Sequence, residues 1–140
     1  MAIKTLTPYV GFRGTADQAV RLYEKALGAK VLHMMRWSEG PMAGQMPAEA
    51  RDKIMHCALS LGGGQIMVCD EPPGGSSSGD SNISICLECD DNDDMSRKFA
   101  ALAEGGQVVM AIHDAFWGAT FGMLRDAFGV KWMFVGPKRS

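Results

Sequence analysis

The chain has 140 residues, a formal net charge of −2 and 46% hydrophobic residues. This length fits one domain of ordinary size, or one domain made of two small halves. The near-neutral charge and the lack of a Lys/Arg cluster argue against nucleic acid and anionic membranes as main partners. No apolar run reaches the length of a signal peptide or a membrane span, so we expect a cytoplasmic protein.

The first half of the chain predicts the order strand–helix–strand–strand–strand. The helix begins with a capping box formed by Thr15 and Gln18 and ends at Gly28. Hydrophobic periodicity places the strands at 5–12, 30–37, 53–61 and 65–69. The same periodicity gives the helix a buried face made of Ala19, Val20, Leu22, Tyr23, Ala26 and Leu27.

Residues 38–52 interrupt this pattern. They contain glycine and proline and have no steady periodicity, which predicts a long loop with a helical turn at 48–51. A loop of this length either covers a binding site or is a mobile surface excursion.

The second half repeats the order after a Gly/Pro/Ser-rich linker at 72–81. A strand at 82–89 precedes a helix that begins in an acidic segment at 90–94, and further strands follow. The helix is expected to bury Met95, Phe99, Leu102 and Ala103.

The two halves align with each other. The segment at 28–31 matches that at 105–108, 77 positions later, and the segment at 63–67 matches that at 129–133, 66 positions later. We predict an α+β fold of two βαβββ modules, at about 4–71 and 82–136, within a single domain at 1–140. Neither half could bury both faces of its sheet alone, which favours pairing of the modules.

Four cysteines are candidates for metal or redox chemistry: Cys57, Cys69, Cys86 and Cys89. The last two have C-x-x-C spacing, but residues three apart on a strand point to opposite faces and cannot bind one ion. We expect buried free thiols, as in a reducing cytoplasm.

Aromatic residues and glycines are concentrated near the C-terminus, in Phe116-Trp117-Gly118, Phe121-Gly122 and the segment at 128–132. Supporting motifs are Thr7-Pro8-Tyr9, Lys53-Ile54-Met55-His56, Leu61-Gly62-Gly63 and Leu102-Ala103-Glu104-Gly105-Gly106. With these motifs the chain resembles the PhnB-like branch of the vicinal oxygen chelate superfamily, which includes glyoxalases, bleomycin-resistance proteins and extradiol dioxygenases. The resemblance implies mixed sheets that curl around a central cup, helices outside, and a homodimer.

Metal-using members of that superfamily place His or Glu at four inward positions. By the resemblance these positions fall near Pro8, within about one residue, and at Met67, Ser84 and Met133. None of these residues is a good ligand for a divalent ion. We therefore expect no metal and no other cofactor, which argues against the usual glyoxalase, resistance-transferase and iron-dioxygenase mechanisms.

Strand alternation suggests which side chains line the cup. On the strand at 53–61, Ile54 and His56 are expected in the cup and Met55 toward the helix, and on 82–89 Ile83 is expected toward the helix. The candidate ligand-pocket residues are His56, Met67, Cys69, Ser84, Cys86, Trp117 and Met133.

His56 is the best candidate for chemistry, as a general base with Glu88 as its orienting partner or as a second acid–base group. The competing interpretation of His56 is a structural histidine, and that of Glu88 is a solvated carboxylate. Trp117 is equally consistent with a pocket wall, a dimer anchor or core packing. His33 and His113 are expected to be structural or exposed.

We therefore predict a metal-independent protein that binds an amphipathic or aromatic small molecule. The alternative is an isomerase, lyase or hydrolase that uses His56 and Glu88, with the option of a metal at non-standard positions. Similar sequences are sometimes labelled quinone-precursor methyltransferases. This activity is disfavoured because the chain has no glycine-rich strand-to-helix turn for a methyl donor.

Overall fold

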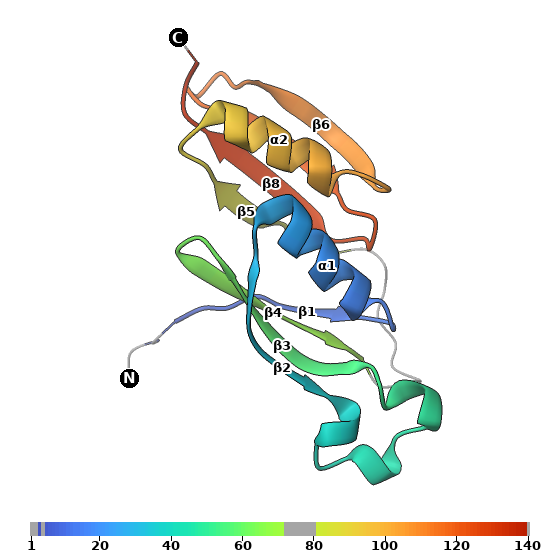
Figure 1. The fold of residues 1–140 in the computed structure, drawn as a ribbon. Coiled ribbons are helices and arrows are strands. Elements are labelled where there is room, and N and C mark those ends of the chain that lie inside the picture. Colours follow the sequence, from blue (N-terminus) through green and yellow to red (C-terminus); the bar gives the residue numbers. More distant parts are fainter. Residues whose placement is uncertain (1–2, 4, 72–80, 140) are drawn as a thin grey trace. The chain divides into compact units, whose positions relative to one another are not determined.

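The structure is a computed structural model that describes residues 3, 5–71 and 81–139. The chain divides into two compact units, Met1–Ser76 and Ser77–Ser140. Both have the element order β-α-β-β-β (Figure 1). The predicted α+β fold of two βαβββ modules is therefore confirmed. Nearly all of the predicted linker at 72–81 lies outside the described residues.

The first unit contains one helix and one four-stranded sheet. Its elements are β1 (Tyr9–Phe12), α1 (Ala16–Leu27), β2 (Lys30–Arg36), β3 (Ile54–Leu61) and β4 (Gly64–Asp70). The strand order is β1-β4-β3-β2, with β1 parallel to β4 and the other pairs antiparallel. The loop before β3 forms three single turns of 3-10 helix, and the last of them, Ala48–Ala50, confirms the predicted helical turn.

Helix α1 packs against one face of this sheet. Its buried residues are Ala16, Ala19, Val20, Tyr23, Ala26 and Leu27, close to the predicted set, and Leu22 is only half-buried. From the sheet, Ile54, Cys57, Leu59, Ile66 and Val68 are buried. The opposite face of the sheet is more exposed, and the candidate residues of this unit lie there.

The second unit repeats the arrangement with β5 (Ile85–Glu88), α2 (Asn92–Leu102), β6 (Gln107–Asp114), β7 (Thr120–Arg125) and β8 (Lys131–Gly136). The strand order is β5-β8-β7-β6. The rings of Phe99 on α2 and Phe134 on β8 pack edge to face, with centroids 5.3 Å apart. Trp132, Phe134, Leu124, Met95 and Leu102 complete a core in which each is at most 1% exposed.

The repeat extends to the strand register. Tyr9 is paired with Met67 in the first unit, and Cys86 with Met133 in the second. Both sheets have a register shift in the strand after the helix, between Val31 and His33 in β2 and between Val108 and Met110 in β6. Equivalent residues can therefore be compared across the two units.

A β-bulge changes the predicted orientation of Ile54. The register shifts between Met35 and Arg36, so that Ile54 lies opposite Arg36, whose guanidinium reaches Asp17 on α1. Ile54 is fully buried and faces the helix, and its predicted place in the cup is wrong. One extra residue inverts the alternation on either side of a bulge, which explains why Met55 is also misplaced by the sequence pattern.

Two strands are shorter than predicted. Strand β1 begins at Tyr9, not at residue 5, and β5 begins at Ile85, not at residue 82. Ile83 thus precedes the strand and is 71% exposed, so its predicted packing against the helix is wrong.

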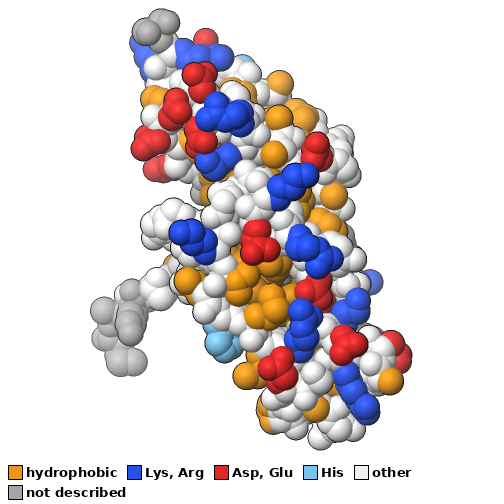
Figure 2. Space-filling view, viewed as in Figure 1, with side chains coloured by type: hydrophobic (Ala, Val, Ile, Leu, Met, Phe, Trp, Pro, Cys, Tyr) orange, Lys and Arg blue, Asp and Glu red, His pale blue; other side chains and the backbone are white. Residues whose placement is uncertain are grey.

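Acidic and basic side chains are interspersed on the visible face of both units (Figure 2). That face carries no broad field of positive charge of the kind that binds nucleic acid. Neither described helix combines the length and the apolar character that crossing a membrane requires.

Candidate functional site

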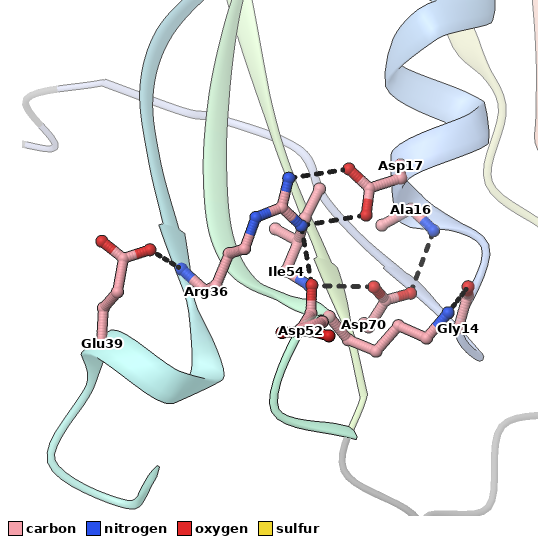
Figure 3. Close-up of polar contacts among 9 residues, drawn as sticks. Gly14, Ala16, Asp17, Arg36, Glu39, Asp52, Ile54 and Asp70 are labelled. Atoms are coloured by element: carbon pink, nitrogen blue, oxygen red, sulfur yellow. Dashed lines mark hydrogen bonds and ion pairs between the residues drawn. The ribbon is translucent and has the colours of Figure 1, made fainter. Parts of the chain in front are cut away.

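Asp70 joins the start of α1 to the start of β3 (Figure 3). It is 1% exposed, and its Oδ1 and Oδ2 each accept a hydrogen bond of 3.0 Å, from the backbone N–H of Ala16 and of Ile54 respectively. The predicted capping box is wrong, because the Thr15 side chain makes no cap hydrogen bond. A charged acceptor from the end of β4 satisfies a free N–H of the helix start in its place.

Arg36 fixes the end of β2 against the same helix (Figure 3). Its Nη1 and Nη2 donate to the two carboxylate oxygens of Asp17 at 3.0 and 3.1 Å, and Nη1 also donates to the carbonyl of Asp52 at 2.7 Å. The hydrogen bonds to Asp17 raise the pKa of Arg36 above its usual value. These contacts stabilise the strand ends that carry the candidate site.

Four side chains, Tyr9, His33, His56 and Cys69, lie on the sheet face opposite α1. We call this cluster the histidine face. The Tyr9 hydroxyl oxygen lies 3.4 Å from Nδ1 of His56, and the two ring centroids are 5.9 Å apart. The rings of His33 and His56 have centroids 5.5 Å apart. Strands β1, β3 and β2 thus bring three rings together from positions far apart in the sequence, with β4 between β1 and β3.

The thiol and the phenol of the histidine face are neutral near pH 7. Burial raises the pKa of the Tyr9 hydroxyl, and Cys69 adds to the effect through its charge and a hydrogen bond. Burial also raises the pKa of the Cys69 thiol, although the hydrogen bond with Tyr9 acts in the opposite direction. Cys69 therefore lacks the lowered pKa of a nucleophilic cysteine.

The structure places three of the predicted pocket residues on this face: His56, Met67 and Cys69. Met67 pairs with Ala58 and Tyr9, and it is half-buried. Tyr9 was not predicted as a site residue, although its place in a strand beside Met67 was a usable signal. Glu88 belongs to the other unit, and within its own unit His56 lies beside Tyr9 and His33.

The second unit carries the remaining predicted pocket residues. On the face opposite α2, register pairs Cys86 with Met133, Met133 with Met123, and Met123 with Met110. We call these four residues the sulfur row. Cys86 is exposed, so the expectation of a buried thiol is wrong at this position. Partial desolvation of the sulfur by its neighbours, and then the nearby carboxylate of Glu88, raises the pKa of the Cys86 thiol.

An aromatic cluster lies beside the sulfur row. The Trp117 and Phe121 rings pack edge to face with centroids 5.7 Å apart, and His113 and Phe121 do so at 6.1 Å. Trp117 is 50% exposed, which makes it a surface residue of its unit and not part of the core. Ser84 is half-buried just before β5, and Glu88 at the end of that strand is exposed.

Two of the four positions expected for metal ligands are methionines on equivalent strands of the two units. Met67 and Met133 occupy equivalent places, paired with Tyr9 and Cys86. Pro8 contacts the neighbouring strand through its backbone, because its carbonyl accepts a hydrogen bond from the backbone N–H of Met67. The residue paired with Met67 in the strand register is Tyr9. Within residues 3, 5–71 and 81–139, no three His, Cys, Asp or Glu side chains are grouped to hold a metal ion.

The fold and the register of the two units define a protein of the βαβββ-repeat class, and family comparison agrees. The family model of the Glyoxalase/Bleomycin resistance protein/Dioxygenase superfamily matches residues 6–134, so the chain belongs to this superfamily. Protein YjdN of Escherichia coli (strain K12) is 32% identical over 136 residues, covering 91% of this chain and 92% of that protein.

Solved structures show the same fold. Protein PA1353 from Pseudomonas aeruginosa superposes with a TM-score of 0.86 and 36% identity, covering 98% of this chain and all of that one (100%). The PhnB protein from Bacillus cereus, described as a putative 3-demethylubiquinone-9 3-methyltransferase, has a TM-score of 0.78 and 21% identity over 95% of this chain and 99% of its own. At that identity the likeness concerns the fold and not the activity.

Proposed function

We propose that this chain is a metal-independent small-molecule-binding protein of the glyoxalase/bleomycin-resistance type, whose ligand is amphipathic or aromatic. The observation that carries this proposal is the histidine face, where hydrogen-bonding groups of Tyr9 and His56 lie beside the apolar Met67. Apolar surface with a few placed polar groups is the usual composition of a small-molecule site. Methionines at the positions of metal ligands in relatives support binding without a divalent ion.

The face opposite α2 supports the same function. Trp117 and Phe121 offer ring surfaces, and the half-buried Met133 offers a flexible apolar contact. The residues proposed to contact the ligand are His56, Met67, Cys69, Ser84, Cys86, Trp117 and Met133.

Titration with 1-anilinonaphthalene-8-sulfonate, an amphipathic aromatic probe, tests this function. We expect saturable binding by the full chain that survives dialysis against EDTA and is weakened by His56→Ala and by Trp117→Ala. Val109→Ala, at a 56% exposed residue of β6 that belongs to neither the histidine face nor the sulfur row, is the control and should bind like the wild type. Stoichiometric zinc, nickel or iron that is lost together with probe binding in His56→Ala would overturn the proposal.

We further propose that the protein is a homodimer in the cytoplasm. The four free cysteines support a reducing compartment, and dimers are typical of this superfamily. Sedimentation equilibrium on the full chain tests the dimer, and a single species at 15.1 kDa across micromolar concentrations would contradict it.

A second candidate function is favoured by the contact between Tyr9 and His56. A phenol next to an imidazole is a possible acid–base pair for an isomerase, lyase or hydrolase. Hydrolysis of p-nitrophenyl acetate by the wild type, lost in His56→Ala without a change in melting temperature, would favour an enzyme over a binding protein. Loss of stability in that variant would instead assign His56 a structural role.

A further inference from the structure

The sulfur row places one thiol and three thioethers side by side across all four strands of the second sheet. Each member is directly paired with the next, in parallel register between β5 and β8 and in antiparallel register from β8 to β7 and from β7 to β6. Directly paired residues share one face of a sheet, with β-carbons about 5 Å apart. Methionine side chains are unbranched and have three rotatable bonds, so neighbouring sulfur atoms can converge on one ion.

This row is reachable from solvent. Met110 is 42% exposed and Cys86 is exposed, while the two central methionines are half-buried. The row side chains point away from the helix because the residues that alternate with them face α2. These alternating residues are buried, and they are Gly122, Leu124, Trp132 and Phe134.

The side chains beside the row supply too few oxygen ligands for a hard ion. Glu88 lies two residues beyond Cys86 on the same face, whereas Arg125 and Lys131, paired with each other, lie two residues from the central methionines. Calcium, magnesium and manganese need several oxygen ligands, and zinc prefers imidazole and thiolate. Thioethers with one thiolate are the ligand type that selects Cu(I).

We propose that the sulfur row binds one Cu(I) ion through Cys86, Met123 and Met133, with Met110 as an outer ligand. On binding, the Cys86 thiol releases its proton to solvent and its sulfur bonds to the ion, while the thioethers coordinate without chemical change. No electron is transferred. The site does not depend on the proposed small-molecule function.

Competition for Cu(I) tests the site. The full chain is titrated without oxygen into the coloured Cu(I)–bicinchoninate complex, and the loss of colour gives the affinity. We expect one Cu(I) per chain, and loss of competition by the Met123→Leu/Met133→Leu variant, which removes two of the three inner ligands. Cys86→Ser should weaken binding and remove its increase with pH, because metal binding displaces a thiol proton.

Matched variants outside the row are the controls. Met42→Leu removes a thioether that is 46% exposed, and Cys69→Ser removes the thiol of the histidine face. Both should bind Cu(I) like the wild type. Absence of competition by the wild type, or equal weakening by Cys69→Ser and Cys86→Ser, overturns the proposal.

A second measurement needs no variant and so does not depend on folding of the double mutant. Ag(I), a redox-inert analogue of Cu(I), is added to protein labelled with 13C at the methionine methyl groups. We expect the resonances of Met123 and Met133 to shift together and to saturate at one equivalent, with Met42 unchanged. Shifts confined to methionines outside the row would show that the ion binds elsewhere.

Discussion

The hydroxyl oxygen of Tyr9 lies 3.4 Å from Nδ1 of His56, although 47 positions separate the two residues. The parallel pairing of β1 with β4 and the antiparallel pairing of β4 with β3 bring them to one face of the sheet. In the second unit the place of Tyr9 is taken by Cys86. The two repeats have therefore kept one fold while carrying different chemistry on equivalent faces.

Replacing Tyr9 by Phe tests the importance of this contact. The residue is 56% exposed, so the loss of its hydroxyl should change the free energy of unfolding by less than about 1 kcal/mol. Affinity for 1-anilinonaphthalene-8-sulfonate should fall several-fold if the histidine face binds the probe. Urea unfolding and fluorescence titration on the same sample separate the two effects. Unchanged affinity at unchanged stability would remove Tyr9 from the site.

The Asp70→Ala variant should be strongly destabilised. It leaves the buried backbone N–H groups of Ala16 and Ile54 without their acceptor, and each such loss costs about 1–3 kcal/mol. Asp17→Ala is the matched control, because it removes only the partly exposed pair with Arg36, worth about 0–1 kcal/mol. Urea unfolding of both variants gives the comparison. Equal losses would contradict the role of Asp70 as the cap of α1.

The sequence predicted the elements better than the contacts between them. Periodicity identified both helices and the repeat. Gly28 ends α1 as its left-handed C-cap with a φ of 70°, whereas α2 already ends at Leu102, before the predicted stop at Gly105. It failed at Ile54, because a one-residue bulge leaves no mark on composition. The capping role of Asp70 was missed because its partner Ala16 lies 54 positions away, and local patterns favoured Thr15. The sequence placed His56, Met67 and Cys69 in one pocket through alternation alone, but it did not show that Tyr9 joins them.

The Gly122→Ala variant tests the packing of the second unit. A β-carbon there would lie 2.8 Å from Cγ1 of Ile112 and 3.0 Å from Cε2 of Phe99, so the core must shift. Overpacking of this kind costs about 1–3 kcal/mol. Gly44→Ala is the control, since no atom lies within 4 Å of the added carbon. Thermal unfolding should show a lower melting temperature for the first variant only. A melting temperature equal to that of the wild type would mean that α2 can move away from β7 at little cost.

Cys57 should make stability fall at alkaline pH. Burial raises the pKa of its thiol from 9.0 to about 11, so the folded protein keeps this proton at pH values where the unfolded chain loses it. The unfolded state is then favoured, and the free energy of unfolding should decrease as the pH rises from 9.0 to about 11. Cys57→Ala removes this titration, and its stability should decline less steeply over the same window, although its absolute stability is lower because a buried side chain is truncated. Urea unfolding at a series of pH values measures both slopes. Groups common to the two proteins cancel in the comparison, so parallel curves would show that ionisation of Cys57 is not linked to unfolding.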